Sequence, residues 1–155
     1  MSTNSKNKIK GYTTLEQAKF LVEQGVDTNS ADMCYKCLGE DPYDLVMRPY
    51  SEWKEEYKGL LINGDADVIP CWSTEALLNL LPGEIKIGDD YRSVYTIDIR
   101  KDSEGYYQIA YGNPFGSSGS WHDMINTSQK KSLCEVADEM LCWLLKYYGY
   151  YIKKE

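Results

Sequence analysis

Apolar residues recur at helical spacing in three segments of the chain. They predict helices over residues 14–24 and 74–81, and a third between Ser132 and Gly149. Each segment begins beside a residue that can cap a helix N-terminus, and each is followed by a residue or pair that ends helices. These three segments are therefore expected to present apolar faces to a common core.

The first of these helices has two possible N-terminal caps. Thr13 with Glu16 and Thr14 with Gln17 both have the spacing of a capping box. Gly25 follows the last periodic residue, where a left-handed C-terminal cap is expected. The sequence predicts the helix and leaves the register of its cap open.

Between the second and third helices the pattern changes to alternation of apolar and polar residues. Strands are predicted over Glu84–Ile87, Arg92–Lys101 and Tyr106–Tyr111, with a hairpin turn at Asp102–Gly105. Such alternation is typical of an antiparallel sheet with one face covered. Residues Gly112–Ser120 read as a loop because of their glycine and serine content.

The order of these elements predicts an α+β fold. Helices and antiparallel strands alternate without repeated βαβ units, which favours a small antiparallel sheet with about three helices packed on one face. A flexible N-terminal tail is expected over residues 1–12 and a single domain over 13–155. Between the first two helices, Ala31–Leu38 reads as extended, and Asn63–Gly64 predicts a turn between short strands.

Charge and composition narrow the classes of partner. The net charge of −7 and the lack of a basic face argue against nucleic acid as a partner, since phosphate contacts dominate such binding. No apolar run is long enough to span a membrane, and no export signal is visible, so a cytoplasmic protein is expected. The 14 Tyr and 4 Trp against 2 Phe favour half-buried sheet faces and interfaces.

The five cysteines offer one short motif, Cys34 with Cys37. A CxxC pair can bind zinc or carry redox chemistry, but zinc needs further ligands and redox chemistry favours a helix N-terminus at the first cysteine. Neither requirement is evident, so reduced structural thiols are the favoured interpretation and no cofactor is predicted. Cys34 and Cys37 remain weak candidates for metal binding.

His122 is the single histidine and the one candidate base for nucleophilic catalysis. Its possible thiol partners are Cys34, Cys37 and Cys71, which would make the chain a small Cys–His hydrolase. Sequence cannot show whether imidazole and thiol meet, and such pairs are recognised by geometry. The hydrolase is therefore an alternative hypothesis.

Aromatic residues predict a contact surface near the C-terminus. On the helical projection Cys142 and Trp143 fall near the solvent side of the last helix, which indicates an interface. The full set of candidate binding residues is Trp72, Trp121, Cys142, Trp143, Tyr147, Tyr150 and Tyr151. The expected occupant is an unknown protein partner or a second copy of the chain.

Three stretches together resemble small proteins encoded in gut-bacterial genomes, often within phage or mobile-element regions. They are Thr13–Tyr35, Ile69–Pro82 and Glu135–Ile152, which contain two capped helices and a final amphipathic helix. The resemblance implies an accessory role in the cytoplasm and carries over no functional residue. The leading hypothesis is thus an accessory protein that binds another protein without catalysis. A Cys–His hydrolase and a zinc-stabilised binding module remain alternatives.

Overall fold

The computed structural model describes residues 10–36, 48–49, 52 and 68–148. The contacts divide the chain into two compact units, Met1–Leu78 with Glu155, and Asn79–Lys154. We call them unit 1 and unit 2.

Unit 1 begins with helix α1, Leu15–Glu23. Its capping box uses Thr14 and Gln17: the Gln17 backbone N–H donates to Thr14 Oγ1 at 3.1 Å, and the Thr14 N–H donates to Gln17 Oε1 at 2.8 Å. Gly25 adopts a φ of 84°, as the expected C-terminal cap requires. The alternative cap at Thr13 is not used, because that side chain is buried against Trp72 instead.

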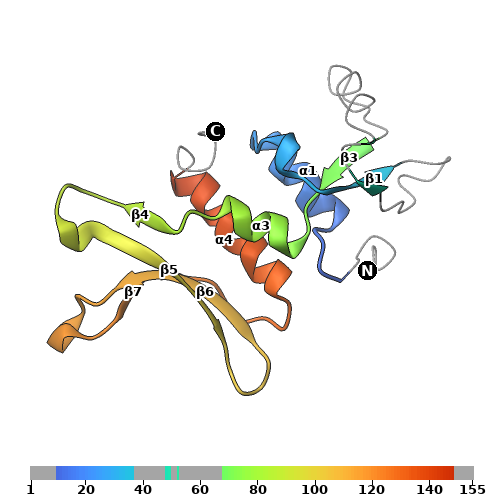
Figure 1. Cartoon of the computed structure of the whole chain (residues 1–155). Helices are drawn as coiled ribbons and strands as arrows, with labels where there is room; N and C mark the ends of the chain where they lie inside the picture. The colour runs from blue at the N-terminus through green and yellow to red at the C-terminus, as the bar shows by residue number, and fades with distance from the viewer. Residues whose placement is uncertain (1–9, 37–47, 50–51, 53–67, 149–155) are drawn as a thin grey trace. The chain divides into compact units, whose positions relative to one another are not determined.

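A three-stranded antiparallel sheet lies next along unit 1. Its order is β2–β1–β3, with β1 at Met33–Lys36, β2 at Arg48–Pro49 and β3 at Val68–Cys71. Helix α1 packs against β3 (Figure 1). All four residues of β3 are buried, so this strand lies at the centre of the unit's core.

Helix α3, Thr74–Leu80, follows β3 directly. Ser73 caps it, since the Ala76 N–H donates to Ser73 Oγ at 3.1 Å. Asp32 fixes the cap from outside by accepting the Ser73 N–H at 2.9 Å and the Ser73 hydroxyl. This helix matches the sequence prediction to within one residue at its end.

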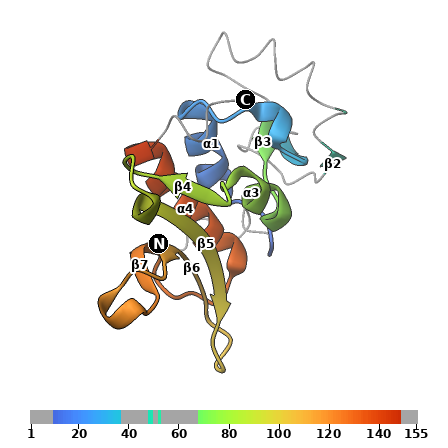
Figure 2. The same cartoon turned by 60° about the vertical axis from the view of Figure 1, so that its left-hand side comes forward.

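Unit 2 contains a four-stranded antiparallel sheet of order β4–β5–β6–β7 (Figure 1). Its strands are β4 Glu84–Lys86, β5 Val94–Lys101, β6 Tyr107–Asn113 and β7 His122–Asn126. Strands β5 and β6 continue into a hairpin that projects from the sheet (Figure 2). Its turn is closed by Asp102, whose Oδ1 accepts the N–H groups of Glu104 and Tyr106 at 2.9 Å.

Helix α4, Leu133–Tyr148, packs against β6 and covers one face of this sheet. Its N-terminus is capped as predicted, with the Glu135 N–H donating to Ser132 Oγ at 3.2 Å. Strand β6 supplies Ile109 and Tyr111 to the core, and both are fully buried. The Tyr111 hydroxyl donates to the Pro82 carbonyl at 2.6 Å, and burial raises the pKa of this phenol.

The α+β class is confirmed, and the strands are divided between two sheets rather than collected in one. The helices are correspondingly distributed: α1 packs on β3, and α4 on β6. The reason is that β1, β2 and β3 pair with one another in unit 1, whereas the alternating strands of unit 2 form their own sheet. The single domain expected over residues 13–155 stays a prediction.

The end of the predicted tail is held in place. Tyr12 forms a bridge with Ser73, and the Thr74 N–H donates to the Gly11 carbonyl at 2.9 Å. Residues 1–9 lie outside the described part of the chain, as do the turn at Asn63–Gly64 and the cap at Gly149.

Candidate functional site

The thiols predicted as nucleophiles belong to the core of unit 1. Cys34 and Cys71 are both fully buried. Cys71 Sγ contacts Thr13, accepting from its Oγ1 at 3.5 Å and donating to its carbonyl at 3.6 Å. A catalytic nucleophile has to be accessible to its substrate. The surroundings of these two buried thiols are therefore those of structural cysteines.

His122 lies on β7 of unit 2 and is exposed. The CxxC motif cannot be followed through the structure, because Cys37 lies outside the described residues. Within the described ranges, no group of three or more His, Cys, Asp or Glu side chains could hold a metal ion. The same part of the chain contains no helix long and apolar enough to cross a bilayer.

The expectation that Trp72 lies on a binding surface is wrong. Its side chain is 0% exposed. The indole Nε1 donates to Ser30 Oγ at 2.9 Å, so the polar tip finds its partner within unit 1. Trp72 is part of the core.

On helix α4, the predicted contact residues are only partly exposed. Cys142 and Trp143 are half-buried, and Tyr147 is exposed, with its ring centroid 4.9 Å from that of Trp143. Burial raises the pKa of Cys142 to about 12, and Cys142 Sγ lies 3.8 Å from Asp138 Oδ1. Tyr150 and Tyr151 lie outside the described residues, so this surface stays a prediction.

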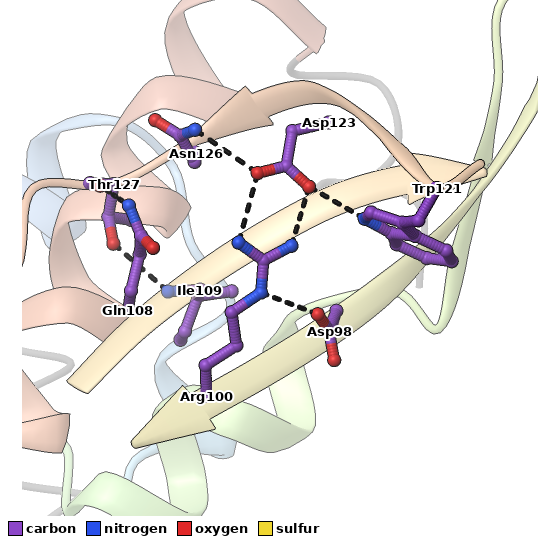
Figure 3. A network of polar contacts seen from close by, with 8 residues as sticks. All are labelled: Asp98, Arg100, Gln108, Ile109, Trp121, Asp123, Asn126 and Thr127. Carbon is purple, nitrogen blue, oxygen red and sulfur yellow. Dashed lines mark hydrogen bonds and ion pairs between the residues drawn. The ribbon is translucent and has the colours of Figure 1, made fainter. Parts of the chain in front are cut away.

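The best-defined polar arrangement lies on the sheet of unit 2, on strands β5, β6 and β7 (Figure 3). A bulge in β7 makes it possible. Asp123 pairs with Gly112 and Ile125 pairs with Tyr111, which leaves Met124 as an extra residue between them. Residues three apart in a regular strand point to opposite faces, so this insertion places Asp123 and Asn126 on the same face.

Arg100 forms the centre of this polar network. Its Nη1 and Nη2 donate to the two carboxylate oxygens of Asp123 at 3.0 and 2.5 Å, and its Nε donates to Asp98 Oδ2 at 2.6 Å (Figure 3). Asn126 Nδ2 also donates to Asp123, at 3.2 Å. The hydrogen bonds from Arg100 lower the pKa of Asp123 to about 2, and those same contacts raise the pKa of Arg100. The guanidinium is therefore already committed to carboxylates of its own chain.

Trp121 extends the network toward the β6–β7 connection. Its Nε1 donates to Asp123 Oδ1 at 2.7 Å, while the side chain remains 44% exposed (Figure 3). The ring lies directly over Gly112, where a Cβ would meet Trp121 Cε2 at 2.8 Å and the His122 carbonyl at 2.4 Å. Only glycine allows this approach, so the backbone below and the carboxylate beside it fix the indole.

A second cluster occupies the connections that flank β5 and β6. Tyr91 and Phe115 meet edge to face with ring centroids 5.4 Å apart, and they are 66% and 46% exposed. Between the two connections lies the buried amide of Asn113. Its Nδ2 donates to the carbonyls of Arg92 at 2.8 Å and Val94 at 3.3 Å, and its Oδ1 accepts the Phe115 N–H at 3.2 Å. One buried side chain thus holds both ring-bearing segments.

The guanidinium of Arg92 completes this cluster. Its Cζ lies 5.5 Å from the Tyr91 centroid and 5.9 Å from that of Phe115, and its Nε donates to the Tyr91 hydroxyl oxygen at 3.1 Å. In an antiparallel sheet the β4–β5 and β6–β7 connections lie at the same end, opposite the β5–β6 hairpin (Figure 1). We call Tyr91, Arg92, Phe115 and Trp121 the loop end of unit 2.

Of these four residues the sequence indicated only Trp121. Tyr91 and Arg92 lie where the predicted strand Arg92–Lys101 begins, and Phe115 lies within the segment read as a loop. The available signal was an aromatic residue in each of two turn-rich connections between neighbouring strands. Comparisons with protein-family models, curated proteins and solved structures found no match to this chain.

Proposed function

We propose that this chain acts by binding another protein, and that the loop end of unit 2 is its contact surface. Exposed Trp, Tyr and Arg side chains are the residue types that contribute most to the binding energy of interfaces. At the loop end, Tyr91, Phe115 and Trp121 lie at the same end of the sheet, and they are 44–66% exposed. This gathering of exposed rings is the observation that carries the proposal.

The rings are also held in position before any partner arrives. Trp121 is fixed by Gly112 and Asp123. The backbone of Phe115 is held by Asn113, and its ring packs edge to face on Tyr91. Side chains that are already ordered lose little conformational entropy on binding. A fixed aromatic surface is therefore better suited to binding than an equally exposed but mobile one.

The edges of the sheet favour loops over strand addition as the mode of binding. Strand β4 is short and carries exposed charges at Glu84 and Lys86. Strand β7 at the opposite edge contains the bulge at Met124. Short, charged or bulged edges discourage pairing with another chain.

An accessory role in the cytoplasm is part of the same proposal. Its support is the acidic charge and the resemblance to small proteins of gut bacteria and their mobile elements. Cell fractionation in the source organism tests the location separately from the binding surface.

Selection of peptides from a displayed random library tests the binding surface even though the partner is unidentified. The affinity of the peptides that are enriched on the wild-type chain is then measured for Phe115→Ala, for Trp121→Ala and for the control Ile99→Ala. Ile99 is 45% exposed, almost the same as Phe115 at 46%, but it lies toward the opposite end of β5. Losing one well-packed aromatic contact weakens affinity by about tenfold or more.

We expect the enriched peptides to lose binding to the two loop-end variants and to keep it for Ile99→Ala. Peptides that bind all four proteins equally would refute the loop end as the preferred contact surface. The hydrolase alternative has less support, since Cys34 and Cys71 are buried in unit 1.

A further inference from the structure

Two arginines of unit 2 differ in what their guanidinium groups contact. Arg100 donates three hydrogen bonds to carboxylates of its own chain. Arg92 is held over two rings, and among the described residues its guanidinium donates one hydrogen bond, from Nε to the neutral hydroxyl of Tyr91. Within the described ranges no ion pair involves Arg92. Both of its Nη groups are therefore open to a bonding partner outside these contacts.

Negative charge lies in the same turn. Asp89 and Asp90 are both exposed, and Asp90 Oδ1 accepts the backbone N–H of Arg92 at 3.1 Å. Asp89 makes no ion pair with another described residue. Asp89 and Arg92, neither of which forms an ion pair with a described residue, thus lie on either side of Tyr91 in the sequence of this exposed turn.

This charge pattern discriminates between kinds of partner. An acidic partner would attract Arg92 but would be repelled by Asp89 and Asp90. A basic partner would attract the two aspartates but would be repelled by Arg92. A second copy related by a two-fold axis pairs each group of one chain with its opposite on the other. The aromatic rings of Tyr91 and Phe115 then supply the apolar centre between the two ion pairs.

Resting on the proposed function, we propose that the loop end binds a second copy of this chain, with Arg92 of each copy meeting Asp89 of the other. A contact surface of a few side chains on each partner is small. The dimer is therefore expected to be weak, with a Kd on the order of micromolar or higher. Dimerisation would be governed by concentration, which makes it measurable with the purified chain alone.

Sedimentation equilibrium over about 10 μM to about 1 mM tests this proposal, since that range spans weak association. The wild-type chain is expected to approach the dimer mass as concentration rises. Arg92→Asp and Asp89→Arg alone each place like charges together and are expected to weaken association at least tenfold. An equal mixture of the two variants is expected to restore the dimer, because every acidic position of one chain again faces a basic position of the other.

The control is Ile99→Ala, which is expected to associate like the wild type. Circular dichroism checks that each variant is folded. A wild-type chain that stays monomeric over the whole range overturns the proposal, and so do single charge variants that associate as strongly as the wild type. A monomeric wild type leaves the loop end open to a foreign partner, which the peptide selection decides independently.

Discussion

Trp72 in unit 1 and Trp121 in unit 2 show opposite uses of the same side chain. Trp72 is fully buried, and its indole N–H donates to Ser30 within the same unit. Trp121 donates its indole N–H to Asp123 but lies on the sheet surface with 44% of its side chain exposed. Both polar tips are satisfied, so hydrogen bonding alone does not distinguish a core tryptophan from a surface tryptophan. What separates them is whether the chain covers the ring.

The largest expected effect follows from removing these two rings. Trp72→Ala should lower the free energy of unfolding by about 3–5 kcal/mol, because it leaves a large cavity in the core. Trp121→Ala should cost about 1 kcal/mol or less, since the ring is already partly in water. Urea denaturation followed by far-ultraviolet circular dichroism measures both. Similar losses for the two variants would contradict the distinction between a core and a surface tryptophan.

The helices could be predicted from the sequence because their signals are local. Capping residues, apolar spacing and terminal glycines act within one or two turns, and all three predicted helices are present. The cap of α1 could not be decided locally. Thr13 accepts the N–H of Trp72, 59 residues away, and this contact removes it from the alternative capping box.

The strand β7 was not predicted because its bulge breaks the alternation of apolar and polar positions. The candidate site depends on that same bulge, since it brings Asp123 onto the face that carries Arg100. The surface around Trp121 likewise depends on Gly112, whose role is set by a ring that packs across it. Tertiary contacts of this kind leave no periodic signal, so only Trp121 of the loop end was indicated in advance.

Two buried polar side chains, Thr13 in unit 1 and Asp138 in unit 2, differ in how well their polar atoms are hydrogen-bonded. In unit 1, Thr13 accepts the Trp72 N–H at 3.1 Å and donates toward Cys71 Sγ at 3.5 Å, so its hydroxyl is satisfied. In unit 2, Asp138 on α4 is buried, and its one described hydrogen bond comes from the weakly polar thiol of Cys142. Burial accordingly raises the pKa of Asp138 from 3.8 to about 6.

A raised carboxyl pKa means that the folded chain binds the proton more tightly than the unfolded chain does. The resulting stability is fully present below pH 3.8 and is lost as pH rises through about 6. Asp138→Asn removes the buried charge and should raise the free energy of unfolding at pH 8 by about 2 kcal/mol. At pH 4 it should have little effect. Urea denaturation at the two pH values measures the difference.

Glu104→Gln is the matched control for this pH dependence, because Glu104 is an exposed carboxylate in the β5–β6 turn. It should change stability little at either pH. An Asp138→Asn variant that gains nothing at pH 8 would show that the carboxylate is adequately solvated or paired in the folded chain.

The smallest expected effect distinguishes the two arginines of unit 2. Lysine keeps the charge at Arg100 but cannot reproduce hydrogen bonds to Asp98 and to both oxygens of Asp123. Because these ion pairs are partly exposed, Arg100→Lys should cost about 1 kcal/mol or less. Arg92→Lys should leave the stability of the chain almost unchanged, since the one side-chain hydrogen bond that Arg92 donates to a described residue goes to the neutral hydroxyl of Tyr91.

An NMR titration of the Asp123 carboxyl group gives the sharper measurement. Its pKa of about 2 lies below the ordinary 3.8, so the ion pair stabilises the fold above pH 3.8 and is lost as pH falls through about 2. Arg100→Lys should move this pKa upward by about 0.5–1 unit, because two oxygens no longer accept from one guanidinium. Arg92→Lys should leave it in place. A shift of equal size in both variants would mean that the pKa of Asp123 does not depend on the two hydrogen bonds from Arg100, and the distinction drawn between Arg100 and Arg92 would fail.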